Sequence, residues 1–225
     1  MTRTENAKIA GTTFLVYIVA GIASMVVFGR ATTGIGIEEK LAGIAQHPTA
    51  VGVVIVLGFV QCFAALVLGI TLYAITREQD NDLAMLGLAC RVGEGVIAGS
   101  SMTRIPALAW LATASGVSAP DAAATHVLGA YLLRGDVAVT AIFFAVGSTL
   151  FSYLFVRGRM IPMPLAWTGL VASVLLVIGL PLQAVGFLSG PITTIMWLPM
   201  LAFEVPLALW LIIKGVSTPL RAANS

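Results

Sequence analysis

Charged side chains occur inside a stretch of the sequence that is predicted to cross a membrane. Arg91, Glu94 and Arg104 all lie within residues 83–112, which are otherwise largely apolar. A charge at the centre of a membrane helix costs about 2.5–3.5 kcal/mol on insertion scales, so it must face protein or water rather than lipid. Arg91 and Glu94 are three residues apart and can pair on one helix face. Ser101 follows on nearly the same stripe.

Glu204 places a second carboxylate within the last apolar stretch. At a rise of 1.5 Å per residue, Glu94 lies ~18 Å beyond Asp82 and Glu204 lies ~15 Å before Lys214. If the two helices are in contact, Arg91 faces two carboxylates at matching depth, which leaves one negative charge in excess. A buried carboxylate without a full partner tends to hold a proton. This arrangement is typical of proton relays and cation sites.

Two interpretations of this cluster follow. In the first, it is a ligand or proton site formed by Arg91, Glu94, Ser101 and Glu204. In the second, the charges only hold the helices in register. Pro206 and Pro199 lack the amide protons that would bond the carbonyls of Ala202 and Ile195. A helix bent near Glu204 would fit the first interpretation, because broken helices at mid-membrane mark transporter sites. Prolines are also common in ordinary spans, where neighbouring groups satisfy the backbone, and we prefer this ordinary interpretation of the two prolines.

The composition predicts an integral membrane protein. Of 225 residues, 59% are hydrophobic and 10% are charged, whereas soluble domains carry about 25% charged residues. A helical span needs about 20 apolar residues, so the length accommodates six spans in a single transmembrane domain, residues 1–225. We predict an all-α, polytopic membrane helix bundle. The expected spans are residues 9–28, 50–76, 83–112, 137–156, 165–188 and 192–213.

Shorter features join and interrupt these spans. The apolar spacing of residues 37–44 predicts a small interfacial helix in the first outer loop, and residues 122–133 predict another, being too short to span. Asp82 is a candidate cap for the third span, and Pro106 is expected to bend that span near its end. Tyr17, in the middle of the first span, is expected to pack against protein.

The distribution of Lys and Arg predicts the orientation. With the N-terminus inside, seven cations fall on the inner side, namely Arg3, Lys8, Arg77, Arg157, Arg159, Lys214 and Arg221. Three fall in the outer loops, namely Arg30, Lys40 and Arg134. We therefore expect a multi-pass protein of the inner (plasma) membrane with both termini in the cytoplasm.

Other function classes receive little support. The net charge of +2 is too small to indicate nucleic acid as a partner, and the expected partners are the lipid bilayer and a small molecule, proton or cation. No motif indicates a cofactor, and His47 and His126 lack the spacing of metal ligands. An enzyme would have to use the buried carboxylates alone. Cys62 and Cys90 lie in predicted spans and are expected to be free thiols.

Several segments resemble a bacterial family of small integral membrane proteins, domain of unknown function 4386. The segments are Ala10-Gly11, Cys90-Arg91-Val-Gly-Glu94, Tyr153-Leu-Phe-Val-Arg157-Gly-Arg159-Met-Ile-Pro162, Leu165-Ala-Trp167-Thr-Gly169 and Glu204-Val-Pro-Leu-Ala-Leu-Trp210-Leu-Ile-Ile-Lys214-Gly215-Val. The resemblance implies six helices, with Arg91, Glu94 and Glu204 as characteristic polar positions. It implies no activity. The favoured function is a small transporter or ligand-binding membrane protein, and the alternative is a structural or accessory membrane subunit.

Overall fold

The structure is a computed structural model that describes residues 1–134 and 138–218. These residues form helices and connecting turns, and no strand occurs among them. The elements are α1 (Arg3–Ala31), α2 (Ile37–Gln46), α3 (Pro48–Thr76), α4 (Asn81–Ser101), α5 (Arg104–Thr113), η1 (Gly116–Ser118), α6 (Ala122–Arg134), α7 (Ala138–Gly158), α8 (Met163–Ala184), α9 (Ile192–Ile195) and α10 (Leu198–Ile213). Six helical stretches of the described chain are long and apolar enough to span a membrane. The all-α prediction is confirmed, and the chain is a multi-pass membrane protein.

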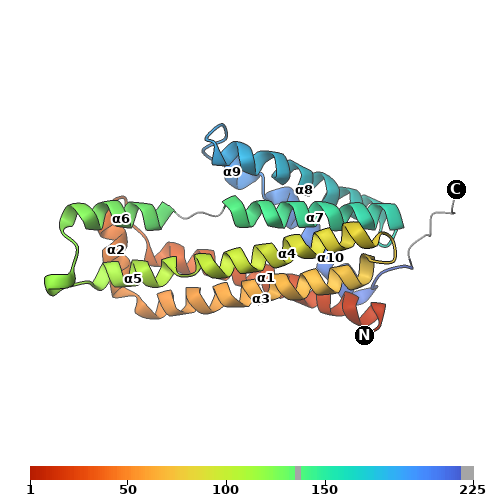
Figure 1. The fold of residues 1–225 in the computed structure, drawn as a ribbon, viewed down its shortest axis with the longest axis horizontal. Helices are drawn as coiled ribbons and strands as arrows, with labels where there is room; N and C mark the ends of the chain where they lie inside the picture. The colour runs from red at the N-terminus through yellow and green to blue at the C-terminus, as the bar shows by residue number, and fades with distance from the viewer. Residues whose placement is uncertain (135–137, 219–225) are drawn as a thin grey trace.

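The long helices form a ring in which each packs against its neighbours in the sequence. Figure 1 shows this bundle from the side, with its helices running roughly along the long axis. Contacts run from α1 to α3, α4, α7, α8 and α10 in turn, and α10 closes the ring by packing on α1. Short connections favour such antiparallel neighbours. The helices that carry the buried charges, α4 and α10, do not pack along each other. Direct contact between these two helices was expected. Instead, only their side chains approach each other, across the interior of the ring.

A second, smaller cluster lies at one end of the ring. The helices α1 and α3 have 29 residues each, about 43 Å at 1.5 Å per residue, which exceeds the ~30 Å hydrocarbon core. Beyond the ring, α2, α5 and α6 pack together around a separate core that includes Leu41, Ile44 and Leu108. The structure thus has helices at both predicted loop positions. In Figure 1, α2 lies across the end of the bundle, whereas α6 runs along its long axis beside α5.

Two of the predicted spans are broken helices. The third span divides into α4 and α5 at Met102–Thr103. In a continuous helix the ring of Pro106 would clash with the Met102 carbonyl, one turn earlier, so a break replaces the expected bend. The sixth span divides into α9 and α10 at Met196–Trp197.

The sequence predicted a bent helix near Glu204, whereas the break in the sixth span lies earlier in the chain. The break in the sixth span precedes Pro199, which is among the first residues of α10. Beyond it α10 is one helix from Leu198 to Ile213 and includes Pro206. Proline is tolerated in the first turn of a helix, where its missing amide proton has no intrahelical partner anyway, and this accounts for the new helix starting at that point.

Other boundaries also differ from the predictions. Asp80, not Asp82, caps α4, and its carboxylate accepts a hydrogen bond from the Leu83 amide at 3.2 Å. The fifth span ends at Ala184 rather than at residue 188. Gly186 follows with φ of 85°, a left-handed conformation that commonly ends helices and favours glycine. The first residue of the predicted fourth span, Val137, lies outside the described residues, as does Arg221.

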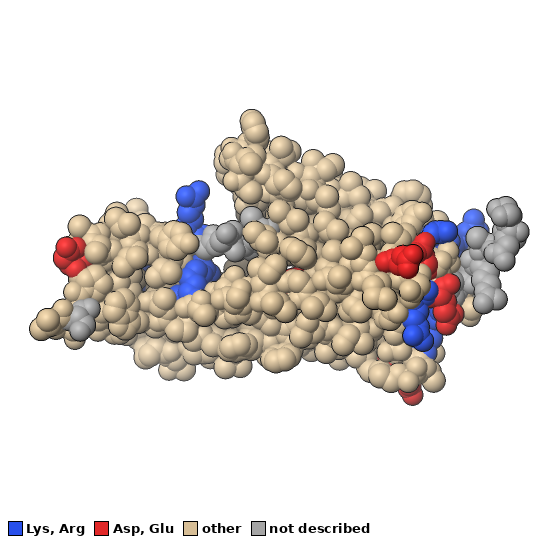
Figure 2. All heavy atoms as spheres, viewed as in Figure 1, with Lys and Arg blue, Asp and Glu red and all other residues tan. Residues whose placement is uncertain are grey.

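Most of the charged side chains visible in Figure 2 gather at one end of the bundle, and fewer lie toward the other end. Acidic and basic side chains gather at the end where α1 begins and α10 ends. Two ion pairs are found there, Arg3 to Glu78 at 3.0 Å and Arg157 to Asp80 at 2.8 Å. Between the ends, large apolar residues such as Phe63 are exposed, as lipid contact requires. Cys62 and Cys90 are buried and free, as predicted.

Candidate functional site

The centre of the site is a buried ion pair on α4. The Arg91 guanidinium donates from Nη1 to Oε2 of Glu94 at 2.9 Å, and the two side chains are 1% and 2% exposed. Two glycines let the neighbouring helices approach this position. A Cβ on Gly69 of α3 would lie 2.9 Å from Cβ of Arg91, and one on Gly147 of α7 would lie 3.1 Å from Cβ of Cys90. The ion pair is therefore enclosed by close helix packing.

Residues from two further helices complete the hydrogen bonding of this pair. The Tyr17 hydroxyl of α1 donates to Oε1 of Glu94 at 2.7 Å. Nη2 of Arg91 donates to the Ser148 hydroxyl of α7 at 3.0 Å. The guanidinium carbon also lies 4.7 Å from the centre of the Phe144 ring, within the range of a cation–π interaction. One network thus joins α1, α4 and α7 in the middle of the ring.

Glu204 faces the same interior from α10. It is 5% exposed, and no hydrogen bond or ion pair to its carboxyl is found within residues 1–134 and 138–218. Arg91 and Glu94 are close enough to interact with it electrostatically. Nε of Arg91 is likewise buried without a partner among the described residues. A buried acceptor and a buried donor are thus left over from the network.

Both groups line one small cavity of about 10 Å³. Its polar lining residues are Arg91, Glu204, Ser148 and Ser152. The remaining lining is apolar and comes from α1, α3, α7 and α10. The cavity holds about one water-sized probe, near the minimum that a buried water requires.

A group of aromatic rings covers the site on one side. Tyr17 and Phe144 are stacked with ring centres 6.4 Å apart, and Trp197 lies 5.9 Å from Phe144. Trp197 is located at the break between α9 and α10. The aromatic group therefore connects the Arg91 site to the broken sixth span.

Comparison with known proteins identifies the family. A family model described as domain of unknown function (DUF4386) matches residues 9–215. The chain belongs to this family. No curated protein matches the chain, and no solved structure does. Every residue of the buried site described above lies within the matched segment.

Ser101 lies apart from this buried site. It is the last residue of α4, and its hydroxyl donates to the Ile97 carbonyl at 3.0 Å. Seven residues separate it from Glu94, about 10 Å along the helix, and Ser101 does not line the cavity. The structure thus brings Arg91, Glu94 and Glu204 together and leaves Ser101 out.

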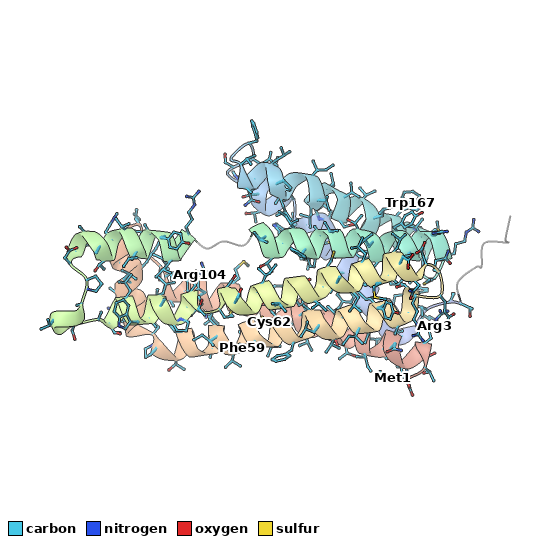
Figure 3. All side chains as sticks on the ribbon, viewed as in Figure 1. Met1, Arg3, Phe59, Cys62, Arg104 and Trp167 are labelled. Carbon is cyan, nitrogen blue, oxygen red and sulfur yellow. The ribbon has the colours of Figure 1, made fainter. Side chains whose placement is uncertain are left out.

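Arg104, the third charge of the predicted span, has a local role. It begins α5, where the guanidinium donates to the Leu132 carbonyl at 3.1 Å. This carbonyl is near the C-terminal end of α6, where carbonyls have no intrahelical partner and a positive charge is favourable. Figure 3 shows Arg104 between the ring and the end cluster. It ties α5 to α6 and lies away from the cavity.

Sequence analysis did not identify Tyr17, Ser148 or Ser152 as site residues. The mid-helix position of Tyr17 was a usable signal, and its expected packing against protein is confirmed by its bond to Glu94 and its stacking on Phe144. Ser148 and Ser152 had no comparable signal, because serines are common in apolar helices.

A larger groove lies on the outside of the ring and carries no such chemistry. It has a volume of about 440 Å³ between α1 and α3 and is lined by valines, phenylalanines, Ala64 and two threonines. One of its residues, Phe59, points away from the bundle in Figure 3. No titratable residue lines it, so the groove is suited to lipid chains rather than to a polar substrate.

Proposed function

We propose that this DUF4386 protein binds a proton at Glu204 in the middle of the membrane and acts as a small proton-coupled transporter or ligand-binding membrane protein. One observation carries the proposal. Arg91 is already neutralised by Glu94 at 2.9 Å, while Glu204 is buried with no bonding partner in the described chain. An ionised Glu204 would be a buried charge without compensation, which is costly. A bound proton removes that charge.

The size and charge of the site favour a proton over a larger ligand. A cavity of about 10 Å³ admits nothing larger than water. A metal cation would have to bind beside the Arg91 guanidinium, which repels it. Glu204 is at mid-membrane depth, because nine residues separate it from Ile213 at the end of α10, or about 14 Å. Ionisable residues at such depth commonly serve in proton relays.

A structural role is the second candidate, and the network itself supports it. Arg91, Glu94, Tyr17 and Ser148 bond one another across α1, α4 and α7. Such a network could serve only to fix the helix packing of an accessory subunit. This role accounts for the bonded groups, but it gives no reason for a carboxyl at position 204.

Replacing Glu204 with glutamine tests the proton site. In lipid nanodiscs, the wild type is expected to show the infrared carbonyl band of a protonated carboxyl, and Glu204→Gln should lose it. Proton flux into liposomes under an imposed membrane potential should fall to the level of empty liposomes. Stability should change little, because glutamine keeps the shape of the side chain.

Glu78→Gln is the matched control. Glu78 is a glutamate of the surface, 63% exposed and paired with Arg3, so its replacement should leave both the band and the flux unchanged. A wild-type protein without the band, or a band that survives in Glu204→Gln, would contradict the proton site. A band without any change in flux would favour the structural role.

We also propose the inner (plasma) membrane as the location, with both termini in the cytoplasm. The described inner cations, including Arg3, Arg77, Arg157 and Lys214, belong to the end where α1 begins and α10 ends. Trp167 lies at the same end (Figure 3), where an aromatic residue would contact the membrane interface.

Reporter fusions test this orientation. A cytoplasmic reporter at the C-terminus is expected to be active, and an external reporter in the turn at Ser189–Pro191 is expected to be active as well. Fusions of each reporter at the opposite site serve as controls. An external C-terminus would overturn the proposed orientation.

A further inference from the structure

The cavity between Arg91 and Glu204 has the features of a water site. Nε of Arg91 is a hydrogen-bond donor, and Oε1 of Glu204 is an acceptor or, when protonated, part of a carboxyl group. Both atoms are buried without partners among the described residues, and both side chains line the same cavity of about 10 Å³. Buried polar groups in folded proteins are nearly always bonded to protein or to ordered water.

A third polar group is present at the cavity. Ser152 is 1% exposed and lines the cavity one turn beyond Ser148 on α7. Ser148 is bonded to Arg91, whereas no hydrogen bond to the Ser152 hydroxyl is found in the part of the chain that the structure describes. A buried water typically makes about three hydrogen bonds, and Arg91, Glu204 and Ser152 supply that number.

We propose that one ordered water molecule occupies this cavity and bridges Nε of Arg91, the Glu204 carboxyl and the Ser152 hydroxyl. The evidence for the water site is the cavity and the unpartnered groups that line it. The further idea that this water exchanges a proton with Glu204 rests on the proposed function. Ser152 is then a positioning residue that holds the water beside Glu204. It lies nearer than Ser148 to Gly158, the end of α7, so the water extends the polar site toward the charged end of the bundle.

The direction in which Ser152→Ala changes the melting temperature tests whether water occupies the cavity. In a dry cavity the Ser152 hydroxyl is buried without a partner, and Ser152→Ala should leave the melting temperature unchanged or raise it. With water bound, the same change removes one of its ligands and should lower the melting temperature by about 2–4 °C, the shift for a lost hydrogen bond in a protein of this size. The measurement uses the full chain in nanodiscs.

Ser173→Ala is the matched control. Ser173 is a fully buried serine on α8, its hydroxyl donates to the Gly169 carbonyl of its own helix at 2.7 Å, and it does not line the cavity. Its replacement should leave the melting temperature nearly unchanged, because the Gly169 carbonyl keeps its backbone partner within α8 and such bonding of a serine to its own helix contributes little to stability. A fall in Ser152→Ala alone supports the water site. An unchanged or higher melting temperature in Ser152→Ala, or an equal fall in both variants, overturns it.

An experimental structure at high resolution gives a second, independent result. Density is expected in the cavity within hydrogen-bonding distance of Nε of Arg91 and the Glu204 carboxyl, roughly 2.7–3.2 Å. A cavity without density, or a Glu204 carboxyl bonded directly to Arg91, overturns the water site. Neither result depends on proton flux, so the water site and the proposed function can fail separately.

Discussion

Replacing Arg91 with alanine is expected to lower the free energy of unfolding by about 3–5 kcal/mol, because it leaves a buried charge without its partner. Arg91 is 1% exposed and is the cation that pairs with Glu94 at 2.9 Å. Its loss also removes the bond to Ser148 and the contact with the Phe144 ring. Glu94 would keep only the Tyr17 hydroxyl as a partner. The effect should be much larger than that of removing an exposed charge.

The native thiols provide the measurement. Cys62 and Cys90 are buried in the folded chain, so a dye that fluoresces on reaction with thiols reports thermal unfolding. Arg157→Ala is the control, because Arg157 is 41% exposed and pairs with Asp80 at the surface. Exposed pairs contribute about 0–1 kcal/mol. If Arg91→Ala and Arg157→Ala lower the melting temperature equally, the buried network does not hold the ring together.

Removing both charges should restore part of the lost stability. Arg91→Met with Glu94→Leu replaces a buried pair by apolar residues of similar size, an exchange that is often neutral or stabilising. The double variant still leaves the Tyr17 hydroxyl without its acceptor. Adding Tyr17→Phe should therefore recover more than the double change alone. A triple variant no more stable than Arg91→Ala would contradict the idea that uncompensated polar groups cause the loss.

The part of the site that could be predicted was local in the sequence. Arg91 and Glu94 could be paired because a separation of three residues fixes their geometry on any helix. The burial of Glu204 could be anticipated because exposure of a carboxylate to lipid is too costly. Both inferences need only the helix and the membrane. They say nothing about which other helices surround the charges.

The remainder depends on how the helices are arranged around the ring. Tyr17 and Ser148 reach the ion pair from α1 and α7, and their partners lie far away in the sequence. Membrane helices present similar apolar surfaces to one another, so their neighbours are selected by small residues and side-chain packing rather than by hydrophobic pattern. Direct contact between α4 and α10 was expected from the matching depths of Glu94 and Glu204, and the ring keeps these two helices apart.

Helix ends and breaks show the same limit. Prolines indicated that the third and sixth spans are irregular, but they did not show at which turn each helix would break. The helix breaks one turn before Pro106 and shortly before Pro199, whereas Pro206 lies inside a continuous α10. A proline removes one backbone bond wherever it occurs, and packing decides whether the helix then breaks.

A valine at position 11 is expected to open the ring where its first and last helices meet. A Cβ on Gly11 would lie 2.5 Å from the Ala208 carbonyl oxygen and 2.8 Å from Cγ1 of Ile212. The atom in the way belongs to the backbone, so α10 must shift as a whole to make room, and Gly11→Val should destabilise by about 1–3 kcal/mol, as overpacking does. Gly29→Val, on the same helix, is the control, because nothing lies within 4 Å of a Cβ there.

The displacement from Gly11→Val should also reach the site. Ala208 lies one turn beyond Glu204 on α10, so a shift of this helix away from α1 moves the carboxyl relative to Arg91. The infrared band of the protonated carboxyl should therefore change in Gly11→Val and stay as in the wild type in Gly29→Val. Equal melting temperatures and unchanged bands in both variants would mean that α1 and α10 do not approach as closely as the ring requires. A change of band together with the lost stability would show that the same contact closes the ring and positions Glu204.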